Sequence, residues 1–257
     1  MTEELKRQDL LELALRVAHE AGLLLMDRPQ NFEISTKSVA IDIATQMDHA
    51  SEKLIVSRLL QARPLDGIIG EEGAARESRS GITWVIDPVD GTVNYLYALP
   101  GWNISIAAKD EQGSLVGVVH APSISSTWSA IRGGGAFLNK RPIHCNDPIE
   151  LDRALIGTGF AYDVRERVEQ GRFIAELLPR IRDLRRMGAA AVDLCYVASG
   201  FFDGYFEAGL KEWDRAAGGL IAQEAGAIVS QTQAGITICA GPTLHSQLSA
   251  LIQADRS

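Results

Sequence analysis

The sequence has few cysteines. Cys145, Cys195 and Cys239 are the three cysteines among 257 residues, an odd and widely spaced set. They indicate free thiols in a reducing cytoplasm rather than a disulfide framework. Since no Cys/His cluster has the spacing of a zinc site, we interpret the three thiols as structural residues of the core.

Long apolar runs, basic patches and linkers are missing as well. No segment approaches the length of a membrane span, and the polar N-terminus lacks the apolar stretch of a secretory signal. The formal net charge of −8 argues against a nucleic-acid groove. An anionic substrate stays compatible with this charge if metal ions reverse the local field. Because no linker or repeat divides the chain, we expect one domain over residues 1–257.

Periodicity predicts helices and strands in mixed order. Helical spacing of apolar residues dominates both ends of the chain, and short β-prone runs typical of an antiparallel meander occupy residues 103–138. The pattern indicates an α/β or α+β fold with helix pairs flanking two sheets. The predicted helices span residues 5–27, 48–61, 164–178, 189–199, 215–225 and 243–253, and the predicted strands span residues 82–86, 104–108, 115–119, 127–131, 227–231 and 236–240.

The most informative segment is WVIDPVDGTVNY, residues 84–95. Its apolar start is typical of a buried strand, and Asp87 and Asp90 follow at the carboxyl end of that strand. Two close carboxylates repel each other, and a hard cation such as Mg²⁺ or Mn²⁺ removes the conflict. Gly91 allows close approach of the backbone to a ligand, and the residues after it are expected to open a helix with free N–H groups toward a phosphate.

Two further acidic segments, GEE at residues 70–72 and WDRAAG at residues 213–218, lie far away in the chain. Each motif alone has an ordinary structural interpretation. Asp-Pro-x-Asp-Gly is a common turn, the adjacent glutamates are typical of a solvated pair, and Asp214 is typical of an N-cap for a helix that ends before Gly226. Their occurrence together favours a metal site.

The three segments resemble those of the inositol monophosphatase family, Mg²⁺-dependent and lithium-sensitive phosphatases. The likeness extends from residues 42–48 to residues 224–226 and rests on DPVDGT and WDRAAG. It implies a layered αβαβα sandwich, assembled as a homodimer, that hydrolyses myo-inositol monophosphate to inositol and phosphate. It also implies two or three Mg²⁺ ions, with Mn²⁺ as a substitute.

The resemblance implies the metal ligands as well. One ion would be held by Glu71, Asp87 and the carbonyl of Val89. A second ion would share Asp87 and bind Asp90 and Asp214. A third, more loosely held ion would involve Glu71, with water supplying most of its ligands.

The resemblance further implies that Thr92, oriented by Asp48, positions or deprotonates a water activated by the ion beside Glu71. Both Thr92 and Asp48 are also typical of helix N-caps. Glu207 follows the alternating sequence DGYF at residues 203–206, which indicates a strand that presents Glu207 to the pocket. The other interpretation of Glu207 is a surface glutamate. We expect substrate contacts from Asp90, Gly91, Thr92, Ala190, Glu207 and Lys211.

The sequence leaves the choice of substrate open. Lys211 stands where animal relatives carry histidine, and Val93 stands where they often carry a second threonine. The alternatives are fructose 1,6-bisphosphate, histidinol phosphate and 3′-phosphoadenosine nucleotides, although Val93 and Asn94 differ from the Lys-Glu pair typical of the nucleotide branch. A different class of function is a non-catalytic regulatory binding role, as in bacterial relatives that bind transcription machinery.

Overall fold

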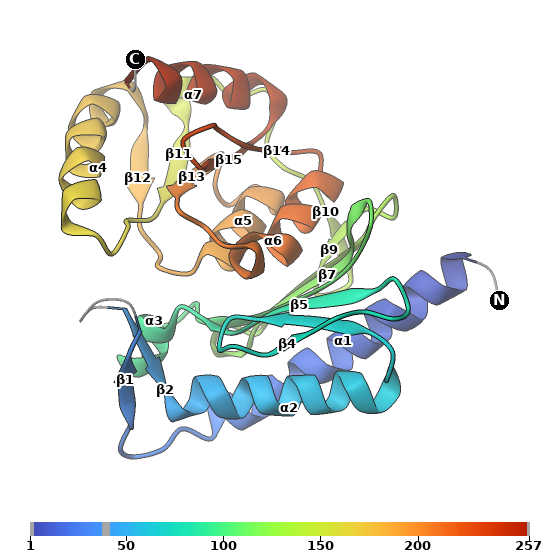
Figure 1. Cartoon of the computed structure of the whole chain (residues 1–257). Coiled ribbons are helices and arrows are strands. Elements are labelled where there is room, and N and C mark those ends of the chain that lie inside the picture. Colours follow the sequence, from blue (N-terminus) through green and yellow to red (C-terminus); the bar gives the residue numbers. More distant parts are fainter. Residues whose placement is uncertain (1–2, 38–41, 256–257) are drawn as a thin grey trace.

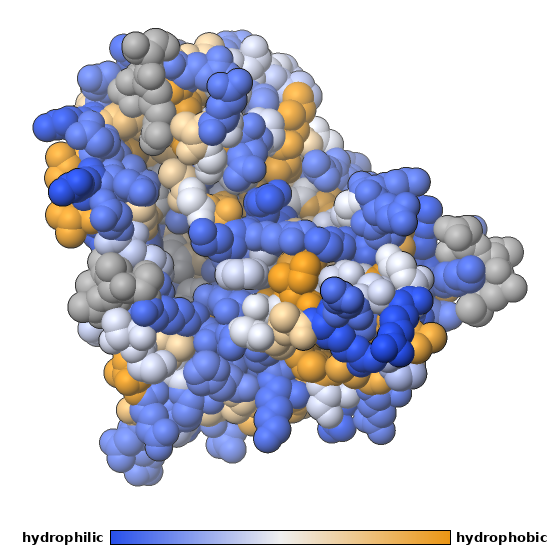
Figure 2. Space-filling model, in the orientation of Figure 1, coloured by the Kyte–Doolittle hydropathy of each residue, from blue (hydrophilic) through white to orange (hydrophobic). Residues whose placement is uncertain are grey.

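The computed structural model describes residues 3–37 and 42–255. Helix pairs and sheets alternate as layers: α1 and α2, an eight-stranded sheet, α5 and α6, a five-stranded sheet, and finally α4 and α7 (Figure 1). This order confirms the predicted αβαβα sandwich. The face shown in Figure 2 is mainly hydrophilic, with exposed hydrophobic residues in separate places.

The first layer consists of α1 (Glu3–Met26) and α2 (Gln46–Ala62). Apolar residues of both helices pack with the nearer face of the eight-stranded sheet around Trp84 and Ile106, which are fully buried. A two-stranded hairpin, β1 (Ile34–Thr36) and β2 (Ile43–Thr45), connects the two helices. Because β2 leads directly into α2, the hairpin lies beside the start of that helix.

The eight-stranded sheet contains the predicted antiparallel meander, which continues outward from β5 through β10. On the other side of β5 the sheet turns parallel, because β3 pairs with β5 in the same direction. The carboxyl ends of β3 and β5 therefore reach the same edge. In spatial order the strands are β10 (Arg141–Ile143), β9 (Ala136–Leu138), β8 (Ser126–Ile131), β7 (Gly113–Ala121), β6 (Asn103–Asp110), β5 (Thr83–Asp90), β3 (Gly67–Gly70) and β4 (Ala75–Arg76).

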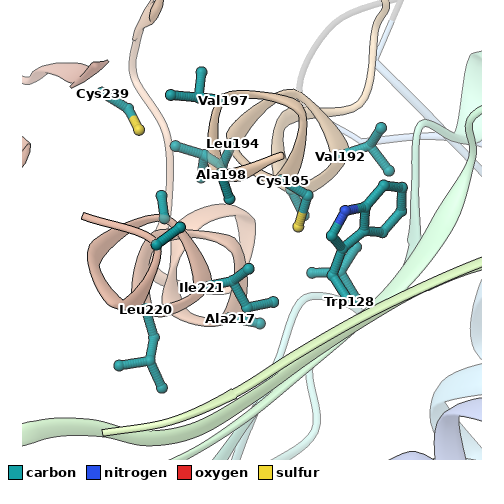
Figure 3. Close-up of a cluster of buried hydrophobic side chains, with 14 of the residues drawn as sticks. Trp128, Val192, Leu194, Cys195, Val197, Ala198, Ala217, Leu220, Ile221 and Cys239 are labelled. Carbon is teal, nitrogen blue, oxygen red and sulfur yellow. The ribbon is translucent and has the colours of Figure 1, made fainter. Parts of the chain in front are cut away.

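The central layer holds α5 (Ala190–Ala198) and α6 (Glu212–Glu224) between the two sheets. Figure 3 shows residues of both helices close to Trp128 of β8. Cys195 and Cys239 are buried in this cluster, Cys145 is partly buried beside it, and all three thiols are free. The predicted structural role of the cysteines fits these positions.

The second sheet and its outer helices complete the fold. Apolar residues of α4 (Val164–Leu177) and α7 (Pro242–Asp255) cover the outer face of this sheet. A 3₁₀ turn, Leu178–Arg180, follows α4 directly, and Pro179 within it lacks the N–H that a continued α-helix would need. The strands in spatial order are β12 (Asp183–Arg185), β11 (Leu155–Thr158), β13 (Gly204–Ala208), β15 (Ile236–Ala240) and β14 (Ile228–Gln231).

Three of the N-cap interpretations are wrong. The N-cap of α2 is Thr45, and Asp48 is the third helical residue, whose Oδ2 accepts the Thr45 backbone N–H at 2.9 Å. Asp214 is likewise the third residue of α6, which begins at Glu212. Thr92 is the first residue of α3 (Thr92–Leu96), behind Gly91. Because α2 and α6 begin earlier than expected, the carboxylates of Asp48 and Asp214 lie within the first turn of their helices, where unpaired N–H groups favour negative charge.

No helix of the described ranges combines the length and the apolar character that a membrane crossing requires.

The close approach of β7 to α6 leads to a stability prediction. A Cβ at Gly117 would lie 2.9 Å from the carbonyl oxygen of Ala217. Because the atoms that this Cβ would meet belong to the backbone of Ala217, we expect Gly117→Ala to lower the free energy of unfolding by about 1–3 kcal/mol in urea denaturation. Gly171→Ala is the control: it lies in α4 with open space around it, and should raise stability by up to about 1 kcal/mol. Equal effects of the two variants would contradict the packing argument.

Candidate active site

The candidate site lies at the carboxyl end of β5. Asp87 and Asp90 belong to the end of this strand, where the register with β6 shifts between the two residues. Pro88 lacks the N–H that a regular ladder needs, and its carbonyl accepts a hydrogen bond from the Ser51 hydroxyl at 3.0 Å. The Val89 N–H donates to Asp87 Oδ1 at 3.1 Å. The irregular end of β5 thus directs two acids from one short segment into the site.

Four of the predicted metal ligands interact electrostatically. Asp87 is 2% exposed, and burial, followed by the charges of Glu71, Asp90 and Asp214, raises its pKa well above the ordinary aspartate value. Residues from β5, from the turn after β3 and from α6 therefore face one another. Carboxylates that repel one another and have strongly raised pKa values are typical of functional sites.

The pKa values of two other acids are raised for the same reasons. Burial raises the pKa of Asp90 to about 7, although hydrogen bonds from Asn103 and from the Ala191 backbone oppose the shift. Burial, and next the charge of Asp90, raises the pKa of Asp214 to about 8. The Lys211 backbone N–H, which donates to Asp214 Oδ2 at 2.6 Å, limits the effect.

Asp90 connects the end of β5 to the start of α5. Its Oδ1 accepts the Ala190 N–H at 3.1 Å, and its Oδ2 accepts the Ala191 N–H and the Asn103 side-chain amide, both at 2.8 Å. Ala190, an expected substrate contact, thus lies beside the acids with its N–H directed at Asp90. Asn103 was not predicted, because an amide on a β-strand has no distinctive sequence signal.

Thr92 and Asp48, which we expect to act on the attacking water, are hydrogen-bonded to each other. The Thr92 hydroxyl lies 2.9 Å from Asp48 Oδ1 and 3.1 Å from the Val89 carbonyl. The other oxygen of Asp48 accepts both the N–H and the hydroxyl of Thr45. Because Asp48 is fully buried and held on both oxygens, its position relative to Thr92 is well determined.

The glutamate pair is not simply solvated. The Glu72 side chain is 5% exposed and the Glu71 side chain 22% exposed, and Lys37 makes ion pairs with both. The Lys37 nitrogen lies 2.7 Å from Glu71 Oε1. Burial lowers the pKa of Lys37, but the charges and hydrogen bonds of the two glutamates outweigh it and raise the pKa. Sequence reasoning missed Lys37, a lone lysine at the end of a short strand.

Glu207 lies in β13 and is half-buried, which argues against the surface interpretation. It accepts a hydrogen bond from the Tyr205 hydroxyl, and a Cβ at Gly159 would lie 1.9 Å from its Oε2. Burial raises its pKa, while the Tyr205 hydrogen bond and the charge of Arg186 lower it. Since its charge also acts on Asp90 and Asp214, Glu207 belongs to the same site.

The other two predicted substrate contacts differ in exposure. Lys211 is exposed at the start of α6, and its contact with the acids is made by its backbone N–H. Gly91 has a positive φ of 86°, and a Cβ there would lie 3.1 Å from that of Ala189. Only glycine adopts this conformation readily beside the neighbouring loop.

The acids have the chemistry of a Mg²⁺ site, since they supply only oxygen donors and their mutual repulsion favours a cation. Within the described part of the chain, no three Asp, Glu, His or Cys side chains are arranged so that they could together hold one metal ion. N–H donors face both oxygens of Asp90 in this arrangement. The donor types fit the ion, because every proposed ligand atom is an oxygen.

A cavity of about 690 Å³ lies beneath α4 and beside β13 and β15. Of the predicted site residues, Glu207 alone lines it. The clustered acids, and not this cavity, define the candidate site.

Comparison with known proteins shows which family the chain resembles. Residues 6–255 match the sequence profile of the inositol monophosphatase family. The inositol-1-monophosphatase SuhB of Mycobacterium tuberculosis is 40% identical over 235 residues, which cover 86% of this chain and 81% of the relative. A Pasteurella multocida protein named Nus factor SuhB is 37% identical over 256 residues, which cover 95% of this chain and 96% of the relative.

Solved structures show the same fold. The extragenic suppressor protein SuhB from Bartonella henselae has a TM-score of 0.90 at 30% identity, and the match covers 95% of this chain and 98% of that chain. The IMPase of Thermotoga maritima has a TM-score of 0.88 at 29% identity, covering 96% and 98%.

The raised pKa values predict how stability depends on pH in the metal-free protein. Folded Asp90 and Asp214 keep protons that the unfolded chain loses above 3.8, so stability falls as pH rises from that value through about 7 and about 8. We expect Asp87→Asn, which removes one repelling charge, to be as stable as the wild type or more so at alkaline pH, and to show a shallower decline. Melting temperatures in chelator across this range test the prediction, and a much lower melting temperature of the variant at every pH would contradict it.

Proposed function

The chain belongs to the inositol monophosphatase family, and on this basis we propose that it is a Mg²⁺-dependent, lithium-sensitive phosphatase that hydrolyses myo-inositol monophosphate to inositol and phosphate. The family match and the relatives support a phosphatase. The observation that carries the proposal is the cluster of buried acids next to the Thr92–Asp48 pair. Retention of the complete acidic set favours catalysis over a purely regulatory role.

The proposed ligands come from three segments. Glu71, Asp87 and the Val89 carbonyl would hold one ion, and Asp87, Asp90 and Asp214 would hold a second. Bound Mg²⁺ would neutralise this cluster and supply Lewis acidity toward water and the phosphate oxygens. Each acid with a raised pKa must lose its proton first, so binding and deprotonation are coupled.

Thr92 and Asp48 would handle the attacking water. The Asp48 carboxylate accepts the Thr92 hydroxyl hydrogen, which leaves the hydroxyl oxygen with lone pairs free to accept from water. Because Asp48 is held by Thr45, the hydroxyl is fixed before the substrate arrives. A group placed in this way lowers the cost of orienting the nucleophile for in-line attack.

The polyol would bind on the α5 and β13 side of the acids. Glu207 is an acceptor for ring hydroxyls, and Tyr205 fixes its orientation. If Asp90 turns toward a metal ion, the Ala190 N–H becomes available to a substrate hydroxyl. The same movement of Asp90 would therefore prepare both the metal site and the polyol site.

We propose a homodimer as the assembly. Exposed apolar residues surround α3: Tyr97 is 71% exposed, Leu99 52% and Val93 39%. Met187, whose carbonyl accepts a hydrogen bond from Asn94, is exposed beside them. Such a group of apolar side chains is typical of a protein interface.

We further propose a single domain over residues 1–257, a cytoplasmic location, and neither nucleic-acid nor membrane partners.

A regulatory role is the second candidate, because relatives from Pasteurella multocida and Haemophilus influenzae carry the name Nus factor SuhB. Phosphate release from inositol 1-phosphate, fructose 1,6-bisphosphate, histidinol phosphate and 3′-phosphoadenosine nucleotides, with Mg²⁺ and after chelation, separates the candidates. We expect the highest kcat/KM for inositol 1-phosphate, loss of activity after chelation, and inhibition by Li⁺. Release from none of the esters would favour the regulatory role.

Thr92→Ala removes the hydroxyl proposed to orient the water. We expect kcat to fall by about a hundredfold or more with little change in KM, since the contribution of the hydroxyl is confined to the transition state. Asp48→Asn should act in the same direction but more mildly. Steady-state kinetics with inositol 1-phosphate measure both variants, and a kcat within a few-fold of wild type would mean that another group activates the water.

Glu207→Gln tests the polyol contact. Loss of the carboxylate charge should lower kcat/KM for inositol 1-phosphate by about tenfold or more relative to p-nitrophenyl phosphate, which has no hydroxyls to bind. Equal losses on both substrates would place Glu207 in support of the metal site or the fold. No loss on either would remove Glu207 from the site.

A further inference from the structure

One face of α2 carries three buried polar residues, of which the proposed reaction uses only Asp48. Asp48 and Ser51 are fully buried and Glu52 is 6% exposed. Their spacing puts them on the same side of the helix. Each one bonds a different segment of the candidate site: Asp48 bonds Thr92, Ser51 bonds the carbonyl of Pro88, and Glu52 bonds the turn that carries Glu71.

Glu52 makes two hydrogen bonds to that turn. Its Oε2 accepts the backbone N–H of Glu72 at 2.9 Å, and its Oε1 accepts the backbone N–H of Ala74 at 3.0 Å. Hydrogen bonds to an ionised carboxylate are stronger than those between neutral groups, particularly when they are shielded from water. The Gly70 N–H donates to the Ala74 carbonyl at 2.7 Å, which closes the turn. The carboxylate thus fills the concave side of residues 70–74.

Gly70 shows how closely the carboxylate approaches the backbone. A Cβ at this position would lie 2.2 Å from Glu52 Oε2. Any other residue would push the carboxylate out of the turn. The position of the Glu52 carboxylate in the turn therefore depends on glycine at position 70.

We propose that Glu52 is a positioning residue, which holds the 70–74 turn so that Glu71 faces Asp87. The inference rests on the proposed function in one respect, namely that Glu71 is a metal ligand. Glu71 has few other constraints: its N–H bonds the Ile86 carbonyl at a long 3.2 Å, and its side chain pairs with Lys37 from a different hairpin. Without Glu52, the turn and with it the Glu71 carboxylate lose their fixed orientation.

The first experiment measures the turn itself in the metal-free protein. In Glu52→Gln and Glu52→Ala, we expect the amide hydrogens of residues 72 and 74 to exchange about tenfold faster or more, while those of core strand β7 keep the wild-type rate. Glu20→Gln is the matched control, because it removes one glutamate charge and a surface ion pair with Arg58 far from the turn. Unchanged exchange at residues 72 and 74, or equal acceleration across β7, would overturn the proposal.

The second experiment measures Mg²⁺ binding by calorimetry. Loss of a residue that orients a metal ligand should raise the Kd by about tenfold to a hundredfold. Gly70→Ala keeps every charge but displaces Glu52, so it should weaken binding in the same direction. In the Glu52→Ala background the same glycine change should add little, because the clash with the carboxylate is gone and only a 3.2 Å contact with Ala74 Cβ is left. Additive losses from the two changes, or a Glu52→Ala Kd within twofold of the Glu20→Gln control, would contradict the proposal.

The two readouts separate this inference from the proposed function. If the wild-type protein neither binds Mg²⁺ nor releases phosphate, the proposed function fails, and amide exchange still decides whether Glu52 holds the turn. If the wild type binds Mg²⁺ and the Glu52 variants bind it equally well, only the positioning role fails. Glu52→Gln preserves shape and volume, so it provides folded protein for both measurements if Glu52→Ala does not.

Discussion

Repulsion among buried carboxylates is the constraint on which the rest of this structure depends. Asp87, Asp90, Asp214 and Glu71 lie close together in a largely shielded site. Burial and the charges of neighbouring acids raise the pKa values of Asp87, Asp90 and Asp214. The fold compensates with oriented donors: the first N–H groups of α5 face Asp90, and that of Lys211 faces Asp214. These contacts hold the acids in place while leaving an excess of negative charge for a cation.

The layered architecture explains how such distant residues meet. Parallel pairing of β3 with β5 brings the turn after β3 to the same edge as Asp87. The central helices α5 and α6 pack between the sheets through small residues, and Gly117 and Gly218 allow backbone contact with neighbouring elements. As a result, the first N–H groups of α5 point at Asp90 at the end of β5, whereas the Lys211 N–H at the start of α6 bonds Asp214 of the same helix. The small residues that allow close packing of the central helices therefore also determine where the charged groups of the site lie.

Much of the fold was predictable, since helix and strand patterns have their own periodicity. The strand over residues 236–240 was predicted with its observed bounds, and the meander from β6 to β8 was placed within a few residues. Helix starts were less accurate, because Asp48 and Asp214 look like N-caps when only the local sequence is considered. Both are third residues of their helices, where their carboxylates accept backbone N–H groups and also face other segments. The choice between these positions depends on tertiary contacts.

The sequence by itself determined the chemical character of the site, since the motifs contain the oxygen donors, the hydroxyl and the glycine that such a site needs. It also determined the order of elements that places those donors at strand and helix ends. Only the tertiary structure decided which side chains support them. Lys37, Glu52 and Asn103 have no local pattern that marks them, because their roles are hydrogen bonds and ion pairs with residues 13 to 35 positions away along the chain. A contact of that kind exists only after packing has brought the segments together.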